Sequence, residues 1–186
     1  MISGIVLAAG TGSRFGGTKQ LAELDGRPLV LHAVAALREG GVDEIIVVTG
    51  HDADAVEAVL PTEIRAVRNA SFRDGQSTSL AAAIHALDER SEAAVVLMAD
   101  QPGVRKTDVR ALIETFRATR ARIARLEFTD GSGPSLLSRE IYADAGHLHG
   151  DAGARVLMAS HPEWVEEVAI DRPVPRDVDT RADLEA

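Results

Sequence analysis

The sequence predicts one α/β domain, a three-layer sandwich in which helices cover both faces of a mostly parallel sheet. Short apolar runs, typical of strands buried on both faces, alternate along the chain with segments of helical spacing. The length of 186 residues is that of one domain, and 45% hydrophobic with 26% charged residues is the composition of a globular protein. Because no linker or repeat interrupts the alternation, we expect residues 1–186 to form a single domain.

The first elements follow from their apolar patterns and from the glycines that end them. Residues 2–8 form an apolar run stopped by Gly10, which predicts a buried strand. Apolar residues recur at helical spacing over 28–38, and Gly40 and Gly41 end that helix. The same reasoning predicts strands over 44–49, 64–67 and 93–99, and helices over 53–60, 78–87 and 107–120.

The last third of the chain is less regular. Strands are predicted over 123–128 and 165–170, and a helix over 151–159, before a proline-rich segment. In sheets of this class, ligands bind outside the carboxyl ends of the strands. We therefore expect the functional residues at four places along the chain: just after Ala8, near Thr49, near Val67 and at Asp100.

Composition excludes several classes of function. The 29 acidic and 20 basic side chains give a net charge of −9, which argues against binding to nucleic acid or to an anionic membrane. The chain has no cysteine, which excludes disulfides, thiolate metal sites and thiol catalysis. No apolar run reaches the roughly 18 residues of a membrane span, and the N-terminus lacks the basic region of a secretory signal. We expect a cytoplasmic protein.

The loop after the first strand has the composition of an anion-binding loop. Four glycines in eight positions allow backbone N–H groups to approach an anion, and two cations add charge: Gly10, Gly12, Gly16, Gly17, Arg14 and Lys19. A dinucleotide fingerprint needs glycine where this chain has Phe15, and in a P-loop the order of Thr18 and Lys19 is reversed. Lys19 and Lys106 are the only lysines among 20 basic residues, so each deserves a specific explanation.

Five separated motifs together indicate one family. The loop has the pattern L-A-A-G-x-G-x-R, and four further motifs follow it in order: Gly75-Gln-Ser-Thr-Ser79-Leu80, Ala99-Asp100-Gln-Pro102, Gly150-Asp151-Ala-Gly153-Ala-Arg155 and Asp177-Val-Asp179-Thr180. Over residues 2–184 the sequence resembles the nucleotidyltransferase superfamily. Within it, the likeness is to the molybdenum cofactor cytidylyltransferase group and its guanylyltransferase relatives. The resemblance implies a Rossmann-like, GT-A-like nucleotidyltransferase fold.

The resemblance also implies a role for each motif in a Mg²⁺-dependent reaction. Arg14 and Lys19 are the implied catalytic cations, with Lys19 near a reacting phosphate. Asp151 and Arg155 face the acceptor in this scheme. The nucleotide contacts the end of the first strand, the loop after it and two later motifs: Leu7, Ala8, Ala9, Gly10, Gly12, Gly75, Ser79 and Asp100.

Asp100 and Asp179 are the expected Mg²⁺ ligands. Asp100 directly follows an apolar strand, so its carboxylate emerges at the carboxyl edge of the sheet, and carboxylates suit Mg²⁺. The family places its second ligand at the acid before the threonine, here Asp179. Asp177 lies on the same side of an extended segment, where it could instead orient a neighbour. The six histidines show no metal-ligand pattern.

Structural roles compete with these functional ones. Ser77 or Ser79 could cap the helix after Gly75, and Asp151 could cap the next one. Lys19 could belong to a surface ion pair, Asp100 to a turn, and Arg155 could be merely exposed to solvent.

The expected reaction transfers CMP from CTP to the phosphate of a molybdopterin-type cofactor and releases pyrophosphate. A phosphate monoester, with a second pKa of about 6, is already a nucleophile and needs no general base. Ala9 stands where guanylyl relatives tend to have glycine, which favours cytosine.

Two alternatives stay open. Gly133 occupies a position where family members often have histidine, so a sugar- or alditol-phosphate acceptor is the first alternative. The second is a non-catalytic nucleotide-binding chaperone that delivers the cofactor to an apo-molybdoenzyme.

Overall fold

The computed structural model describes residues 1–150 and 153–185, and within them seven strands form one sheet of order β5-β4-β1-β6-β8-β7-β9. Neighbouring strands pair in parallel except at β8, which is antiparallel to both β6 and β7. The mostly parallel sheet predicted from the sequence is confirmed. The strands are β1 (Ile2–Ala8), β4 (Glu44–Thr49), β5 (Arg65–Arg68), β6 (Ala93–Met98), β7 (Ile123–Phe128), β8 (Gly131–Ser138) and β9 (Val165–Ile170).

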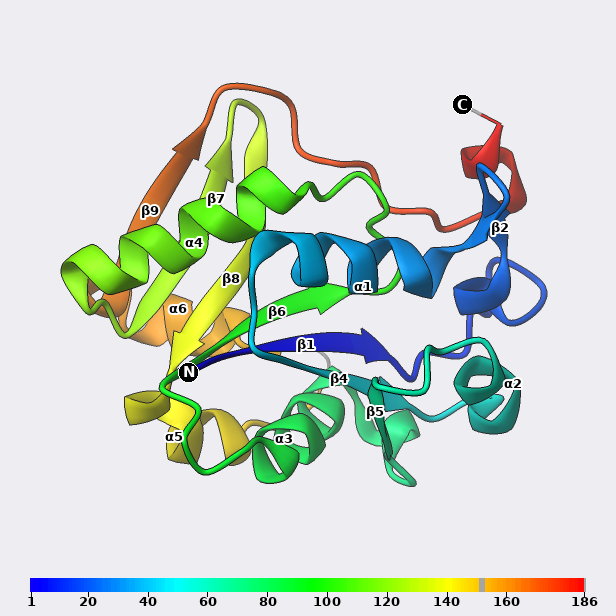
Figure 1. The fold of residues 1–186 in the computed structure, drawn as a ribbon, viewed down its shortest axis with the longest axis horizontal. Coiled ribbons are helices and arrows are strands. Elements are labelled where there is room, and N and C mark those ends of the chain that lie inside the picture. The colour runs from blue at the N-terminus through cyan, green and yellow to red at the C-terminus, as the bar shows by residue number, and fades with distance from the viewer. Residues whose placement is uncertain (151–152, 186) are drawn as a thin grey trace.

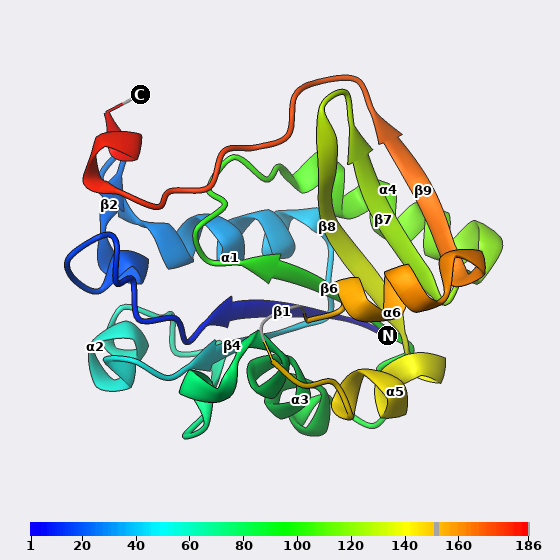
Figure 2. The ribbon, with the colours of Figure 1, turned by 180° about the vertical axis from the view of Figure 1, so that it is seen from behind.

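Helices cover both faces of this sheet (Figures 1 and 2). One face carries α1 (Leu29–Gly40) and α4 (Lys106–Thr119), which pack against each other. The other face carries α3 (Gln76–Ala86), α5 (Tyr142–Gly146) and α6 (Arg155–Ser160), while α2 (Ala53–Ala58) follows β4. None of the helices in the described ranges is long and apolar enough to cross a membrane.

The central strand β1 contributes to two separate apolar cores. Val6 and Ala8 point toward the core beneath α1 and α4, while Ile5 and Leu7 point toward the core beneath α3. Every residue of the strand is buried, which explains why it is a continuous apolar run instead of an alternating one. The alternation also decides which residues reach the candidate site, because Leu7 and Ala9 share one face and Ala8 lies on the other.

Strand β8 was not predicted, and its composition explains why. Between the pairs Glu127–Ser132 and Arg125–Ser135, β8 has two residues where β7 has one. Those two are Gly133 and Pro134, and this extra residue is a bulge. Proline lacks the N–H that a regular ladder needs and is tolerated at such irregularities. The short β2–β3 hairpin (Glu23–Leu24 and Arg27–Pro28) and helix α5 were not predicted either.

The predicted caps of the later helices need correction. Helix α3 begins at Gln76 and its cap residue is Gly75, so the capping roles predicted for Ser77 and Ser79 are wrong. Gly75 has a φ of 115°. The N–H of Ser77, in the first turn of the helix, donates to the carbonyl of Gly150 at 3.1 Å, so a neighbouring loop supplies the acceptor that the helix itself lacks there. Helix α6 begins at Arg155, and the predicted cap Asp151 lies outside the described residues.

Candidate active site

The carboxyl edge of the sheet holds a lysine between two carboxylates. Lys19 Nζ lies 2.7 Å from Asp100 Oδ2 and 3.2 Å from Asp179 Oδ1, and only 13% of the lysine side chain is exposed. Burial by itself lowers the pKa of Lys19, but the hydrogen bonds and negative charges of the two aspartates outweigh it, so the pKa is raised. Lys19 is therefore a protonated, largely buried cation and not a surface lysine.

The glycine loop after β1 is folded back so that Lys19 reaches this position. Gly12 has a φ of 57°, and its carbonyl accepts the N–H groups of Phe15 and Gly16 at 2.9 and 3.2 Å. A Cβ at Gly12 would lie 2.7 Å from the carbonyl oxygen of Gly17, so the turn requires glycine. Phe15 is buried and packs with Leu29 and Val178, which anchors the loop.

Asp179 comes from the C-terminal segment, which crosses the edge of the sheet. The N–H of Val178 donates to the carbonyl oxygen of Asp100 at 2.9 Å, so the two carboxylates are set side by side by a backbone contact. Asp183 accepts the N–H groups of Asp179 and Thr180 at 3.0 and 2.6 Å, which fixes the segment. Figure 2 shows this segment running from β9 across the molecule to the neighbourhood of β2.

A third carboxylate, that of Asp177, lies at the same edge. Gln101 Nε2 donates to its Oδ1 at 2.8 Å. Desolvation and the like charges of Asp100 and Asp179 raise the pKa of Asp177, against the opposing effect of this hydrogen bond. The alternation predicted for Asp177 and Asp179 therefore brings both acids to one edge, and Gln101 is the neighbour that Asp177 contacts.

Three cavities with shared lining residues lie at this edge of the sheet. A small one of about 100 Å³ is lined by Gly10, Gly12, Lys19 and Asp100. A cavity of about 570 Å³ includes Ala9, Phe72, Arg73 and Ser79, and one of about 520 Å³ includes Gln101, Arg125 and Arg155. Leu7 and Met98 line all three. The small cavity, lined by Lys19 and Asp100, therefore lies next to two larger ones.

The charged groups suit a divalent cation that shares its shell with a substrate. Asp100 and Asp179 both lie within ion-pair distance of one cationic centre. In residues 1–150 and 153–185, no three His, Cys, Asp or Glu side chains form a ready-made metal site. Two carboxylates with the remaining positions left to phosphate oxygens and water is the donor set that Mg²⁺ favours.

The other predicted site residues fall into two groups. Arg14 is 74% exposed and lies 3.2 Å from Asp179 Oδ2, and Ser79 is buried beneath the 570 Å³ cavity, where Asn69 Nδ2 donates to its hydroxyl at 3.0 Å. The side chain of Ala8 points into the opposite core, and Gly75 forms a turn against Gly150; neither lines these three cavities. The structure thus gathers most, but not all, of the predicted nucleotide-binding residues.

Gly133, where a histidine was expected, is packed against an aromatic ring. A Cβ there would lie 2.3 Å from Cε2 of Phe128, so a larger residue does not fit without moving that ring. Arg172 also lies over this ring, 4.9 Å from its centroid. Phe128 thus occupies the space that a side chain at position 133 would need.

Several lining residues were not among the predicted nucleotide contacts. Gln76 and Met98 line both large cavities, and Gln76 Nε2 lies 2.7 Å from Met98 Sδ. Met98 could have been found by counting back two residues from Asp100, because alternate strand residues share a face. Phe72 and Arg73 lie in a short turn before α3 that carries no motif.

Comparison with known proteins identifies the family. A family model described as the MobA-like NTP transferase domain matches residues 4–165. The chain belongs to the MobA-like NTP transferase family. The nucleotidyltransferase resemblance deduced from the five motifs is confirmed, and the loop, Asp100 and the Gly75 segment all lie inside the matched range.

Curated relatives of this nucleotidyltransferase carry different names. Nicotine blue oxidoreductase of Paenarthrobacter nicotinovorans is 34% identical, across 96% of this chain and 92% of that protein. The bifunctional protein GlmU of Cutibacterium acnes is 32% identical over 82% of this chain and 38% of its own length. The chain therefore spans little more than a third of that GlmU protein.

Solved structures show the same fold. Rv0371c of Mycobacterium tuberculosis superposes with a TM-score of 0.88 at 31% identity, covering 100% of this chain and 97% of that one. A nucleotidyl transferase of Methanothermobacter thermautotroptrophicus superposes with a TM-score of 0.80 at 26% identity, covering 93% of this chain and 88% of that one. The predicted nucleotidyltransferase fold is confirmed.

Proposed function

We propose that this nucleotidyltransferase transfers CMP from CTP to the phosphate of a molybdopterin-type cofactor, with Mg²⁺ and with release of pyrophosphate. One observation carries the proposal: Lys19 pairs with Asp100 and Asp179, beside a small cavity that shares the lining residues Leu7 and Met98 with two larger ones. Transfer between two substrates needs this layout, with a nucleoside on one side, an acceptor on the other and the reacting phosphates between them.

The chain's own groups have separable tasks in this scheme. The glycine loop and Arg14 bind the triphosphate, and Lys19 donates hydrogen bonds to a reacting phosphate and offsets the charge that develops there. An oxygen of the acceptor phosphate attacks the α-phosphorus, the bond to the bridging β-phosphate oxygen breaks, and pyrophosphate leaves. Because the acceptor is an anion with a second pKa of about 6, no residue has to remove a proton from it.

The two aspartates fit a divalent cation. Asp100 and Asp179 supply the carboxylate oxygens, and the bound Mg²⁺ would neutralise the triphosphate and polarise its α-phosphoryl group. A structure of Rv0371c, 30% identical and covering 99% of this chain with a TM-score of 0.86, is described as a complex with manganese. That description supports a divalent cation in this family.

The choice of CTP is supported by the position of Ala9. Ala9 is 5% exposed and lines the 570 Å³ cavity together with Phe72 and Ser79. A Cβ placed on neighbouring Gly50 would approach the Ala9 methyl to 2.8 Å, so the wall is closely packed there. A methyl group at this wall narrows the cavity and favours a single-ring base over a purine.

Other acceptors and roles remain as alternatives. The likeness to GlmU proteins and the glycine at position 133 favour a sugar- or alditol-phosphate nucleotidyltransferase. A cofactor-delivery chaperone for an apo-molybdoenzyme would bind the nucleotide without turnover. The oxidoreductase name belongs to the Paenarthrobacter relative, whereas the paired cation and carboxylates here support phosphate chemistry.

The decisive experiment measures pyrophosphate release from CTP, GTP, ATP and UTP, each with molybdopterin, with a hexose 1-phosphate and with no acceptor. We expect release from CTP with molybdopterin and Mg²⁺, and none after addition of a chelator. Release with the hexose 1-phosphate instead would establish the sugar-phosphate alternative. Nucleotide binding without any release would establish the chaperone.

The base preference has its own test in Ala9→Gly. Removing one methyl group is worth about 1–3 kcal/mol in a binding pocket, so we expect a partial shift toward GTP and not a full switch. The measurement is the ratio of kcat/KM for CTP to that for GTP, with the same acceptor. A parent enzyme that prefers GTP, or a ratio that does not move, would remove Ala9 as the determinant.

A further inference from the structure

The 520 Å³ cavity on the acceptor side has a distinct composition. Among the described residues that line it, the charged ones are both arginines, Arg125 and Arg155, although the chain as a whole is acidic. Apolar side chains, among them Val96, Met98 and Met158, line other parts of it. The cavity thus offers an apolar slot that ends in a hydrogen-bond donor.

Arg125 lies far from the reacting groups. In the sheet register, Val96 of β6 pairs with Ser135 of β8, which pairs with Arg125 of β7, so the three side chains form a row on one face. Two strand spacings separate β6 from β7, a distance of about 10 Å. Since Asp100 follows β6, an acceptor that reaches Arg125 must extend well beyond its reacting phosphate.

The contacts of Arg125 leave part of its guanidinium without a partner. Its Nη2 lies 2.8 Å from Glu167 and 3.4 Å from Glu127, and Ser132 donates to the latter carboxylate at 2.8 Å. Its Nε is buried and has no hydrogen-bond partner in the described part of the chain. A buried donor without a partner costs stability, and a ligand in the cavity would meet the exposed quarter of this side chain and not the buried Nε.

The charge balance around Arg125 favours a neutral ligand. One guanidinium faces two carboxylates, so the local sum is negative and a second anion would be repelled. A carbonyl or amide oxygen can accept from the guanidinium without that repulsion. Ser132 and Ser135 also line this cavity; the Ser135 hydroxyl can donate to the same oxygen, and Ser132, whose hydrogen goes to Glu127, can accept from an amide N–H.

We propose that Arg125 is a specificity-determining residue that binds a neutral, oxygen-bearing group, an amide or ring carbonyl, at the far end of the acceptor. This inference rests on the proposed function, in which the acceptor's phosphate reacts beside Lys19. The apolar slot between the two ends selects a flat, ring-containing molecule. Arg125 therefore favours such an acceptor over small phosphate esters that cannot span the cavity.

Three non-reacting probes test this without nucleotide or turnover: phenyl phosphate, 4-carbamoylphenyl phosphate and 4-carboxyphenyl phosphate. Their dissociation constants are measured by calorimetry with the full chain and with Arg125→Gln and Arg125→Lys. Arg122→Gln is the matched control, since Arg122 pairs with Glu140 and lies over Trp164, outside this cavity.

We expect the parent to bind the amide probe at least about tenfold more tightly than phenyl phosphate, the gain of a charge-assisted hydrogen bond. The carboxylate probe should bind less tightly than the amide. Arg125→Gln should lose the amide preference while binding phenyl phosphate as before, which also shows that it is folded; Arg125→Lys should keep part of the preference. Arg122→Gln should behave as the parent.

Equal affinities for the amide probe and phenyl phosphate, or an Arg125→Gln variant that keeps the preference, would overturn the role of Arg125. Tighter binding of the carboxylate than of the amide would overturn the neutral-group assignment. Absence of binding by all three probes would also overturn the inference. The proposed function is judged separately by pyrophosphate release, so its failure is distinguishable from these results.

Discussion

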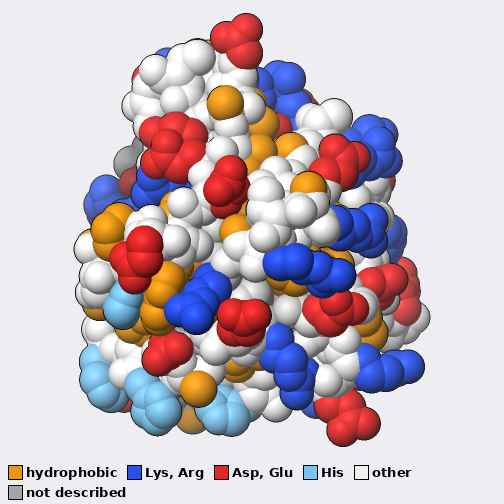
Figure 3. Space-filling view, turned by 90° about the vertical axis from the view of Figure 1, so that its left-hand side faces the viewer, with side chains coloured by type: hydrophobic (Ala, Val, Ile, Leu, Met, Phe, Trp, Pro, Cys, Tyr) orange, Lys and Arg blue, Asp and Glu red, His pale blue; other side chains and the backbone are white. Residues whose placement is uncertain are grey.

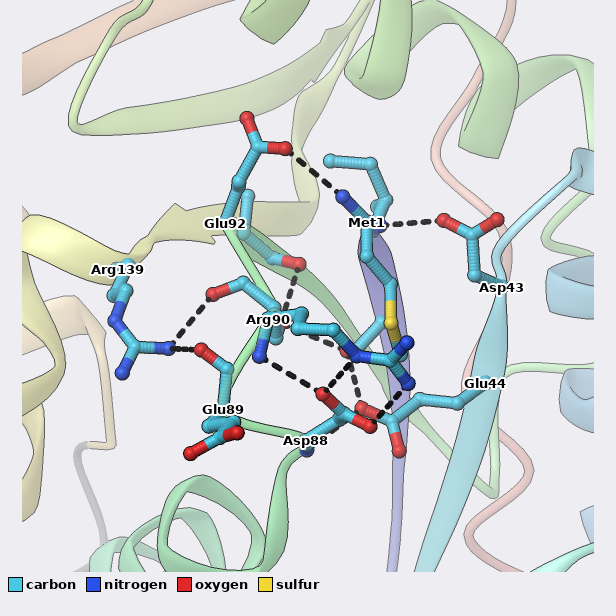
Figure 4. Close-up of polar contacts among 12 residues, drawn as sticks. Met1, Asp43, Glu44, Asp88, Glu89, Arg90, Glu92 and Arg139 are labelled. Atoms are coloured by element: carbon cyan, nitrogen blue, oxygen red, sulfur yellow. Dashed lines mark hydrogen bonds and ion pairs between the residues drawn. The ribbon is translucent and has the colours of Figure 1, made fainter.

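Charged side chains are arranged differently at the amino and carboxyl ends of the sheet. At the amino end, opposite charges are paired: the terminal amine of Met1 lies 2.9 Å from Glu92, and Asp88 lies 2.8 Å from Arg90 (Figure 4). Figure 3, which views the molecule from that side, shows acidic and basic side chains interspersed across the surface. At the carboxyl end, three aspartates lie close together beside the largely buried Lys19, and the exposed Arg14 pairs with Asp179.

The pKa directions at the two ends differ accordingly. The hydrogen bonds from Arg90 hold the pKa of Asp88 well below its usual range. Desolvation and neighbouring carboxylates raise the pKa of Asp177. A paired network stabilises the fold, whereas crowded like charges cost stability and are retained where a cation or a charged substrate is bound. The crowding of like charges thus favours the carboxyl end as the functional one.

The largest effect expected from this comparison is on turnover. Asp100→Asn and Asp179→Asn keep the side-chain shape but remove charge, and each should lower kcat at least about a hundredfold, the scale of a main electrostatic contribution. Asp88→Asn, at the paired end, should lower stability and leave kcat unchanged. Pyrophosphate release measures all three. Parental turnover in Asp100→Asn or Asp179→Asn would remove that residue from the metal site.

The next effect separates the two lysines of the chain. Lys19→Arg places a larger, planar head where only 13% of the side chain is exposed, so we expect a fall in kcat of about tenfold or more. Lys106→Arg is the matched control, because Lys106 is 51% exposed in an ion pair with Glu39. It should behave as the parent. Equal activity of Lys19→Arg and the parent would show that any positive charge suffices at position 19.

The paired end should govern stability in acid. Since the folded-state pKa values of Asp88 and Glu92 are lowered, their contribution is present above the ordinary carboxyl pKa of about 4 and is lost as pH falls below it. In Asp88→Asn, the free energy of unfolding should be lower at pH 7 and should fall less steeply between pH 5 and pH 3. Urea unfolding at a series of pH values measures both slopes; parallel curves would contradict the pairing argument.

The smallest effect expected is a gain in stability at the crowded end. Asp177→Asn removes one of three like charges and keeps a group that can still bond to Gln101, so we expect the Tm to rise by about 1–2 °C. Thermal unfolding in the presence of a chelator measures it. A lower Tm would mean that the hydrogen bond from Gln101 outweighs the repulsion.

Much of the fold could be predicted because buried parallel strands are continuous apolar runs. The runs at residues 2–8, 44–49 and 123–128 match the observed strands in full. Strand β8 was missed because Gly133 and Pro134 interrupt its pattern, and a bulge is a tertiary solution that short-range patterns do not reveal. The start of α3 was misplaced for a similar reason, since Gly150 provides the contact at its end.

The candidate site could be predicted only where chemistry is tied to strand ends or motifs. Asp100 follows from its place after β6, and the rarity of lysine drew attention to Lys19. Asp179 required the resemblance, because the sequence alone does not tell that Val178 would bond to the carbonyl of Asp100. Nothing in the sequence marks Arg125 as a residue that lines the cavity, because the order of the strands in the sheet is what brings it there.

The path of the C-terminal segment has a consequence for how the enzyme matures during synthesis. The last strand ends at Ile170, and the second carboxylate, Asp179, follows it along the chain. Because domains gain structure while the ribosome is still adding residues, the strands of the sheet emerge before this carboxylate does. The nascent protein therefore passes through a stage at which every strand of the sheet has been synthesised but the proposed cation site still lacks Asp179. The proposed site is completed by residues that follow the last strand of the sheet along the chain.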